Sequence, residues 1–162
     1  MRVHIGGDHA AYELLNDLVA FLTDEGHEVT NHGPHVYDAL DDYPVFVLRA
    51  AEAVAADPDS LGVVLGGSGN GEQMAANKVT GIRCALAYNT ELAELARQHN
   101  GAQVVSIGGR FTAADEAREI VRTFLDTPFT GETRHQRRID MVSAYEADGT
   151  LPTSDCPSVG SD

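Results

Sequence analysis

A glycine-rich segment that leads directly into a carboxylate is the part of the sequence that most suggests chemistry. Residues 66–71 read Gly-Gly-Ser-Gly-Asn-Gly and are followed by Glu72. Backbone N–H groups without bulky side chains can bind an anion, and the positive end of a helix dipole strengthens that binding. Beside such groups, Glu72 could abstract a proton from carbon while the loop stabilises the resulting oxyanion.

The same segment has a simpler interpretation as a tight turn between a strand and a helix. It is not a Walker loop, because Glu72 stands where the lysine would follow the last glycine, and its glycine spacing does not match the dinucleotide-binding fingerprint. An acid in the first turn of a helix is common for structural reasons. Burial would raise the pKa of Glu72 and the helix dipole would lower it, and the sequence does not decide between them.

Two pairs of polar residues are further candidates for function. Asp8-His9 follows the first apolar run, and His99-Asn100 precedes Gly101. An aspartate at the start of a helix is a common N-cap, and His, Asn and Gly are all typical of a helix end. Each pair therefore has a structural interpretation beside the functional one.

Positive charge is scarce in this chain. Its 11 Lys and Arg residues stand against 25 Asp and Glu residues, which gives a formal net charge of −14 and argues against nucleic acid or an anionic membrane surface as a partner. Any anion site must draw on the few arginines. Arg134 and Arg138 are spaced i,i+4 and share a helical face that could hold a phosphate, although surface ion pairs would explain them equally well.

Metal, redox and targeting signals are not evident. The histidines have no defensible metal-ligand spacing, so we expect no metal and no cofactor. Cys84 and Cys156 are far apart and form no disulfide framework or Cys-x-x-Cys motif. No apolar run approaches the roughly 18 residues of a membrane span, and the first residues already alternate like a strand. We therefore expect a cytoplasmic protein without a membrane segment.

The elements that must position these residues follow from the hydrophobic periodicity. Strands are predicted at residues 3–5, 28–31, 61–65, 83–87 and 102–107. Helices are predicted at residues 10–22, 44–56, 90–100, 112–125 and 132–146, with Thr90 and Thr112 as capping residues. This alternation predicts a Rossmann-like, three-layer α/β/α sandwich with a five-stranded parallel sheet and an extra C-terminal helix, whose strand order cannot be predicted.

The chain length fits one domain, which we place at residues 1–147. Residues 148–162 are rich in Pro, Ser, Thr, Gly and Asp and are predicted to be a disordered tail. In open α/β sheets, ligands bind outside the carboxyl ends of the strands. We therefore expect the loops that follow the strands to form the site.

Taken together, the motifs resemble type B ribose-5-phosphate isomerase, a family of sugar-phosphate aldose-ketose isomerases. The similarity runs in order from residue 1 to about 146. The matching segments are Gly6-Gly7-Asp8-His9-Ala10, Gly67-Ser68-Gly69-Asn70-Gly71-Glu72, Ala75-Ala76-Asn77-Lys78, Arg97-Gln98-His99-Asn100, Gly108-Gly109-Arg110 and Arg134-His135-Gln136-Arg137-Arg138.

The resemblance implies a set of site residues. Catalysis would fall to Glu72 as the base, to His99 and Asp8 in opening the sugar ring, and to Ser68 near the reacting oxygens. The implied substrate-binding residues are Asp8, His9, Gly67, Ser68, Gly69, Asn70, Gly71, Asn100, Arg110, Arg134 and Arg138.

One position departs from the pattern of many family members. They place a catalytic cysteine just before the glycine loop, where this chain has Gly66, and neither cysteine of this chain is near. The sequence is similar to the branch in which a glutamate at the end of the loop, here Glu72, replaces the thiol. The family also implies a homodimer or larger assembly with sites shared between subunits.

The expected reaction is the reversible interconversion of D-ribose 5-phosphate and D-ribulose 5-phosphate through an enediolate, in the pentose phosphate pathway. It requires a carbon base, an oxyanion hole and a proton relay, and no metal or redox cofactor. Two alternatives remain: the same chemistry on galactose 6-phosphate or allose 6-phosphate, and a nucleotide-binding module without catalysis. For the enzyme, we expect Arg110, Arg134 and Arg138 to converge on one pocket.

Overall fold

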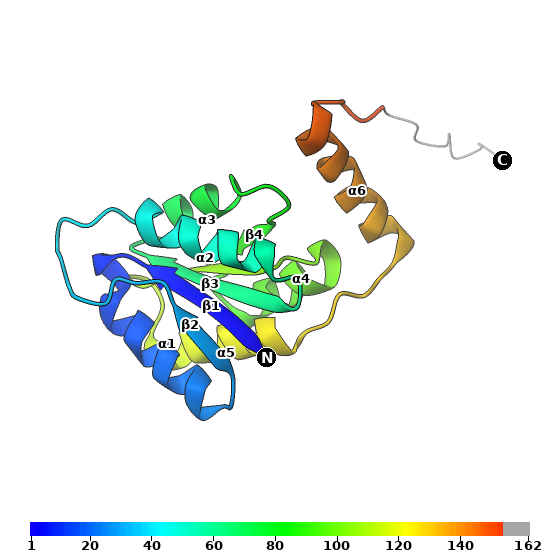
Figure 1. Cartoon of the computed structure of the whole chain (residues 1–162). Coiled ribbons are helices and arrows are strands. Elements are labelled where there is room, and N and C mark those ends of the chain that lie inside the picture. The colour runs from blue at the N-terminus through cyan, green and yellow to red at the C-terminus, as the bar shows by residue number, and fades with distance from the viewer. Residues whose placement is uncertain (154–162) are drawn as a thin grey trace.

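The computed structural model describes residues 1–153 (Figure 1). Five parallel strands form one sheet in the order β2-β1-β3-β5-β4. The strands are β1 (Arg2–Gly7), β2 (Glu28–Asn31), β3 (Ser60–Gly66), β4 (Cys84–Leu86) and β5 (Val104–Gly108). Every residue of β3 is buried, as expected for the central strand of a sheet with helices on both faces. The predicted parallel α/β architecture is therefore confirmed.

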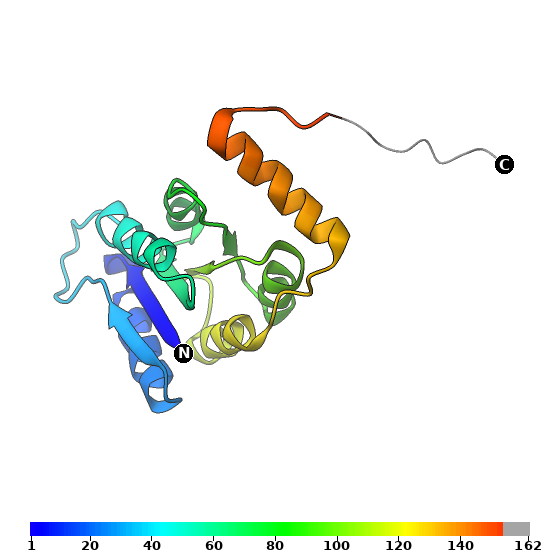
Figure 2. The ribbon, with the colours of Figure 1, turned by 45° about the vertical axis from the view of Figure 1, so that its right-hand side comes forward.

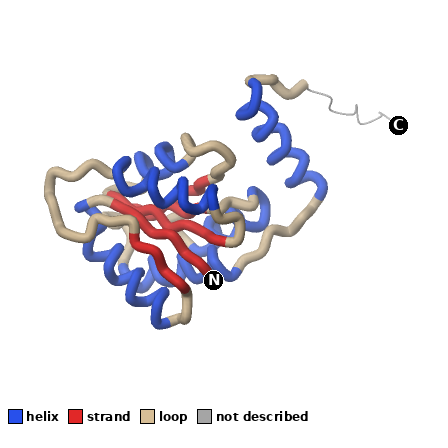
Figure 3. The backbone as a smooth tube through the Cα atoms, viewed as in Figure 1, coloured by secondary structure: helices blue, strands red, loops and turns tan. Residues whose placement is uncertain are grey.

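Helices cover the sheet on both faces, which makes the three predicted layers (Figure 3). They are α1 (Tyr12–Asp24), α2 (Pro44–Ala56), α3 (Asn70–Ala76), α4 (Thr90–Asn100), α5 (Ala114–Asp126) and α6 (Thr133–Asp148), with a short 3-10 turn η1 (His9–Ala11) before α1. One core cluster joins α1, α4 and α5 to the sheet, and a second joins α2 and α3 to the opposite face. The core is thus divided by the sheet.

The connections of β1 and β3 run in opposite directions along the sheet. β1 leads to β2 on one side, whereas β3 leads to β4 on the other side, beyond β5. Such a reversal opens a crevice at the carboxyl ends of the two strands, where ligands of open α/β sheets bind. The segments after β1 and β3 carry Asp8 and the glycine loop, so the fold places both at this crevice.

Two predicted helix caps are wrong. Asn89, not Thr90, is the N-cap of α4: its backbone is extended and its side chain accepts the N–H of Leu92 at 2.8 Å. Ala113 occupies the N-cap position of α5 without a side-chain hydrogen bond, so Thr112 lies one residue too early to cap it. The segment periodicity was sufficient to find both helices but not the residue that caps each of them.

The C-terminal helix α6 extends away from the sheet and its covering helices (Figure 2). Near its start, buried His135 stacks on His99 of α4, with ring centroids 4.2 Å apart. Near its end, Glu146 accepts the backbone N–H of Gly81 at 2.9 Å. Asp148 still belongs to this helix, so the predicted tail begins one residue too early, and residues 154–162 lie outside the described part of the chain.

None of the helices within residues 1–153 has the length and apolar character needed to cross a membrane.

Candidate active site

Asp8 ties the end of β1 to the end of β3. Its backbone N–H donates to the carbonyl of Leu65 at 3.2 Å, and its carboxylate accepts the N–H of Ala10 at 3.0 Å. The capping interpretation of Asp8 is therefore confirmed. The residue is 8% exposed, and burial raises the pKa of its carboxyl while the Ala10 N–H lowers it. A capping role does not prevent Asp8 from facing the crevice with its other oxygen.

The glycine loop is held in a conformation that requires glycine. Gly69 has φ +80°, and a Cβ on it would lie 2.6 Å from Cδ1 of Leu86. Ser106, a fully buried residue of β5, donates its hydroxyl to the Gly69 carbonyl at 2.7 Å. At the exposed tip, the Ser68 hydroxyl accepts the backbone N–H of Asn70 at 3.3 Å. The loop is therefore anchored to β5 through Gly69 and exposed to solvent at Ser68.

Glu72 lies in the first turn of α3 and is only 4% exposed. A Cβ built on Gly66 would lie 1.8 Å from Oε1 of Glu72, so the carboxylate occupies the space beside that glycine. Burial raises the pKa of Glu72; backbone N–H groups of Glu72 and Gly69 lower it, and the charge of Asp8 raises it. The question left open by the sequence is answered, because burial outweighs the amides of the helix start.

Arg110 supplies positive charge to the same edge. Its backbone N–H donates to the carbonyl of Gly67 at 3.1 Å, and a Cβ on Gly67 would lie 3.5 Å from Nη1 of Arg110. The guanidinium also lowers the pKa of the Asp8 carboxyl. Asp8, the loop, Glu72 and Arg110 therefore form one cluster, as predicted.

His9 belongs to this edge as well and is paired with a residue that was not predicted. Oδ1 of Asp41 lies 2.7 Å from the ring Nδ1 of His9 and accepts the backbone N–H of His9 at 3.0 Å. Potential ligand atoms of Asp8, His9 and Asp41 lie within 4.8 Å of one another, which is close enough for a shared metal ion. The 2.7 Å contact is a hydrogen-bond distance, whereas ligands around one zinc ion lie about 3 Å or more apart. Our expectation of no metal stays a prediction.

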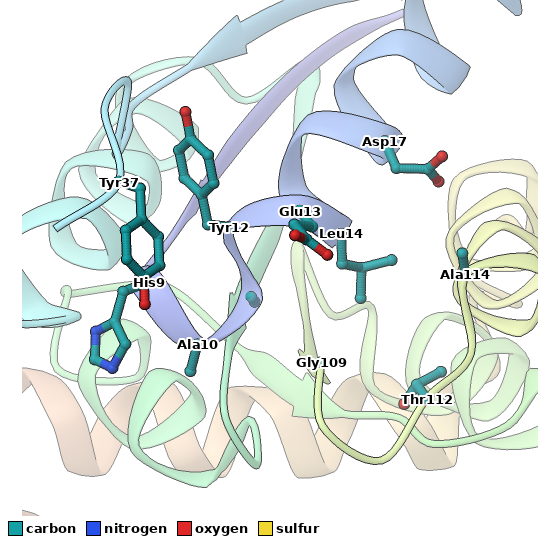
Figure 4. A pocket seen from close by; sticks show the side chains of 11 residues that line it. His9, Ala10, Tyr12, Glu13, Leu14, Asp17, Tyr37, Gly109, Thr112 and Ala114 are labelled. Carbon is teal, nitrogen blue, oxygen red and sulfur yellow. The ribbon is translucent and has the colours of Figure 1, made fainter. Parts of the chain in front are cut away.

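A cavity of about 790 Å³ opens beside His9 (Figure 4). Figure 4 shows the rings of His9, Tyr12 and Tyr37 on one side and Gly109 and Thr112 on the other. Glu72 and the loop residues 67–71 are not part of its wall. The cavity therefore adjoins the cluster around Glu72 rather than containing it, and His9 lies where the two meet.

His99 and Asn100 lie at the opposite edge of the sheet. They end α4, which leads into the start of β5, and Arg83 just before β4 donates to the Asn100 carbonyl at 2.7 Å. The loop cluster lies at the strands' carboxyl ends, so the length of β5, roughly 16 Å, separates the two groups. Gly101 follows with φ +51°, which confirms the predicted C-cap. A single chain does not bring His99 to Glu72.

Arg134 and Arg138 are also remote from Arg110 within one chain. Both are exposed on α6, where Arg134 pairs with Glu132 at 2.7 Å. The surface ion pair considered from sequence is thus present for Arg134. Convergence of the three arginines on one pocket does not occur inside a single chain and stays a prediction for an assembly.

Three residues of this edge escaped the sequence interpretation. Tyr43 packs on the glycine loop so closely that a Cβ on Gly71 would lie 2.8 Å from its Cζ, and Asp41 and Ser106 support His9 and Gly69. Asp41 and Tyr43 belong to the segment after β2, and Ser106 lies within β5. The rule that sites follow strand ends points to the segment of Asp41 and Tyr43, but hydrophobic periodicity does not single out an individual residue in an irregular loop.

Comparison with known proteins gives consistent matches. Residues 3–142 match the family model described as Ribose/Galactose Isomerase. The ribose-5-phosphate isomerase B of Mycolicibacterium paratuberculosis is 54% identical over 94% of this chain and 96% of its own length. The enzyme of the same name from Mycobacterium tuberculosis is 53% identical over 94% of both chains.

Solved structures agree in fold. The ribose-5-phosphate isomerase B of Mycoplasma genitalium, determined with bound ribulose-5-phosphate, has a TM-score of 0.87 and 39% identity, covering 91% of this chain and 97% of that one. The type B enzyme of Trypanosoma cruzi gives a TM-score of 0.86 and 42% identity, covering 91% of this chain and 99% of that one.

Proposed function

The chain belongs to the ribose/galactose isomerase family, and we propose that it interconverts D-ribose 5-phosphate and D-ribulose 5-phosphate by proton transfer at Glu72. The observation that carries the proposal is a buried carboxylate at the end of a glycine loop, with a pKa raised by burial. A base works best when its pKa lies near the working pH. A buried glutamate such as Glu72 is therefore better suited to proton abstraction than an exposed glutamate would be.

The chemistry needs three groups, and the edge of the sheet offers one of each. Glu72 takes the proton from C2 of the open-chain aldose, and the electron pair passes to O1 as the enediolate forms. The amides of the glycine loop stabilise the oxyanion, and the Ser68 hydroxyl passes the proton from O2 to O1. Glu72 then returns its proton to C1, so that no net proton is gained or lost.

The contact between Glu72 and Gly66 supports the assignment of the base. A side chain at position 66 and the carboxylate of Glu72 would occupy the same space. A family member with a cysteine at that position would place its thiol where this chain has the Glu72 carboxylate. We infer that the Glu72 carboxylate and a thiol at position 66 would occupy the same location, so that only one of them can be present as the base.

Complete sites require a second copy of the chain in this proposal. His99, Asn100, Arg134 and Arg138 lie far from Glu72 within one chain, yet they match the family's motif. Apolar side chains of α6 are also exposed, including Met141, Val142 and Tyr145, which share one helical face. In a homodimer, these side chains would be covered, and α4 and α6 of one subunit would bring His99 and the arginines to the partner's glycine loop.

Phosphate binding explains how a strongly acidic protein holds an anionic sugar. Arg110 lies beside the loop, and Arg134 and Arg138 would approach from the partner. Arginine holds phosphate bidentately, so a few convergent guanidinium groups suffice against a net charge of −14. Phosphorylated sugars do not cross membranes freely because of their charge. We therefore place the reaction in the cytoplasm, within the pentose phosphate pathway.

Glu72→Gln tests the assigned base. The amide keeps the size of the side chain but cannot take a proton, so turnover of ribose 5-phosphate should fall about 10²-fold to 10⁴-fold. Glu91→Gln, an exposed change in the first turn of α4, is the matched control and should leave turnover unchanged. Near-normal activity of Glu72→Gln would remove the proposed role. Parallel assays with galactose 6-phosphate and allose 6-phosphate test the five-carbon preference.

Mixing two inactive variants tests the shared sites. Glu72→Gln and His99→Ala subunits, unfolded and refolded together, should form mixed dimers in which one site carries both defects and the other carries none. Random mixing should then restore about a quarter of wild-type activity. If the mixture stays inactive although mixed dimers are present, each site uses residues of a single chain.

A further inference from the structure

We propose that Asp41 is a positioning residue for His9: its carboxylate fixes the orientation of the imidazole and leaves Nε2 to donate a hydrogen bond to an anionic oxygen of the substrate. The proposal deepens the assignment of His9 as a substrate-binding residue and therefore rests on the proposed function. Asp41 lies in the segment between β2 and α2, which carries none of the residues expected from the sequence to bind substrate.

One oxygen of Asp41 holds His9 at two points. Oδ1 accepts the ring Nδ1–H at 2.7 Å and the backbone N–H at 3.0 Å. An ionised carboxylate only accepts hydrogen bonds, so Nδ1 must carry the proton in this pair. Two bonds to one oxygen fix the side-chain rotamer of His9 relative to its own backbone. Nε2 is then the ring atom left for a ligand.

The surroundings of Asp41 favour a charged partner. Its side chain is 9% exposed, and its Oδ2 is buried with no hydrogen-bond partner among residues 1–153. A buried carboxylate oxygen without a partner is costly, and a cation on the other oxygen offsets that cost. An imidazolium at His9 supplies that cation. The hydrogen bond with Asp41 raises the pKa of His9, although partial burial lowers it and the charge of Asp8 raises it further.

The groups around the ring of His9 agree with this charge state. Asp8 lies at the end of β1, Asp41 in the following segment, and the ring of Tyr37 meets His9 edge-on with centroids 6.5 Å apart. Both carboxylates favour the protonated ring. His9 lines the cavity beside the cluster around Glu72 (Figure 4), so a protonated Nε2 there is placed to meet the anionic end of a sugar phosphate.

Histidine ring titration by NMR tests the pair without relying on activity. Resonances of His9 are assigned with His9→Gln and followed against pH in the wild type, Asp41→Asn and Asp42→Asn. Asp42 is exposed and adjacent, so its substitution removes the same charge from the same segment and serves as the control. We expect His9 of the wild type and of Asp42→Asn to titrate above the ordinary histidine range, and His9 of Asp41→Asn to titrate lower.

Kinetics with ribose 5-phosphate test the consequence. Above the pH at which His9 of Asp41→Asn loses its proton, that variant should show a KM raised about 10-fold, the scale of one charge-assisted hydrogen bond, with kcat within about 3-fold of wild type. The KM difference should shrink toward low pH, where both rings are protonated. In a His9→Gln background, Asp41→Asn should add little, because its effect acts through His9.

The outcomes separate the two proposals. If the wild type is active but Asp41→Asn matches Asp42→Asn in both His9 titration and KM, the role of Asp41 is overturned and the proposed function is not. Additive effects of Asp41→Asn and His9→Gln on KM would also overturn the role of Asp41. A wild-type His9 that titrates at or below the ordinary value overturns it even if the variant fails to fold. Stoichiometric zinc binding that abolishes the His9 titration would assign the pair to a metal site instead. Lack of wild-type turnover would remove the proposed function and this inference together.

Discussion

The Glu72 carboxylate fills the space that a side chain at Gly66 would need, with Oε1 only 1.8 Å from the position of a Cβ on that glycine. Gly66 closes β3 and Glu72 lies in the first turn of α3, so the strand and the helix after it meet at this point. The contact explains why glycine is needed at a position with ordinary backbone geometry. It also means that substitutions at Gly66 can test where the base lies.

Gly66→Ala should displace Glu72 and reduce turnover of ribose 5-phosphate about 10²-fold or more, because the carboxylate can no longer occupy its place. Overpacking should also cost about 1–3 kcal/mol in the free energy of unfolding. Gly66→Ala combined with Glu72→Ala should recover much of that stability but no activity, since the clash is gone and so is the base. Urea unfolding and initial-rate assays measure the two effects; an active Gly66→Ala variant would show that Glu72 acts elsewhere.

A thiol placed at position 66 should partly replace the missing base. Gly66→Cys with Glu72→Ala puts a cysteine into the space that the carboxylate vacates, and it should turn over substrate at least about 10-fold faster than Gly66→Ala with Glu72→Ala. The alanine pair is the matched control because it lacks only the sulfur. Equal rates for the two double variants would contradict the idea that thiol and carboxylate share one location.

The raised pKa of Glu72 predicts a pH dependence of stability. In the unfolded chain this glutamate titrates near 4.5, and burial raises its pKa in the folded chain. The folded state therefore favours the protonated form, and this contribution is present below 4.5 and is lost as pH rises through the folded pKa. Relative to Glu72→Gln, which has no proton to lose, the wild type should lose unfolding free energy over that rise.

Urea unfolding of both proteins from about pH 4 to pH 8 measures this difference, because all other titrating groups are common to the two. The acidic limb of the wild-type kcat/KM profile should lie above the ordinary glutamate range for the same reason. A difference in unfolding free energy that grows in favour of the wild type with pH would contradict the raised pKa.

The elements of the fold were largely predictable because their signals are local. The apolar run at 61–65 predicted β3, which spans Ser60–Gly66, and the predicted helix at 44–56 coincides with α2. Helix starts were less predictable, since Asn89 and Thr90 both suit an N-cap and only the extended backbone of Asn89 decides between them. Periodicity reports which face is buried, whereas a cap depends on the dihedral angles of one residue.

The candidate site was predictable only in parts. Asp8, Glu72 and Arg110 follow strands and meet at one edge, as the topology of a parallel sheet requires. His99 belongs to a helix end, which the same topology places at the opposite edge, so its motif alone does not give its position relative to Glu72. Asp41 reaches His9 across 32 positions of sequence, a contact made by the path of an irregular segment.

Cys84, the cysteine within the described residues, should not react with alkylating reagents. Cys84 is buried in β4, and burial raises the pKa of its thiol. Alkylation requires an accessible thiolate. In a Cys156→Ser background, iodoacetamide at pH 8 should leave the native enzyme unlabelled and active, as measured by intact mass and turnover. The Gly66→Cys, Glu72→Ala variant in the same background should take up one label and lose its activity. Rapid inactivation of the Cys156→Ser enzyme itself would instead show that it has an essential thiol.

Ser106 should affect catalysis as well as stability, although it touches no substrate. Its buried hydroxyl donates to the Gly69 carbonyl at 2.7 Å. Ser106→Ala removes this bond at a cost of about 0.5–1.5 kcal/mol, because the carbonyl still accepts the N–H of Gln73 at 3.0 Å. Ser60→Ala is the matched control: Ser60 is also buried and its hydroxyl also donates to a backbone carbonyl, that of Asp57 at 2.7 Å, but it begins β3 at the edge away from the loop. Both variants should unfold at lower urea concentration.

Only Ser106→Ala should change the kinetics, because the glycine loop holds its amides toward the oxyanion through the Gly69 anchor. We expect a reduction of about 10-fold in kcat with a smaller change in KM, since the loop amides act most strongly on the charge that develops in the transition state. Initial rates at saturating and limiting ribose 5-phosphate separate the two parameters. If Ser106→Ala and Ser60→Ala lose equal stability and keep equal turnover, the anchor is structural, and the oxyanion is held by groups other than the amides around Gly69.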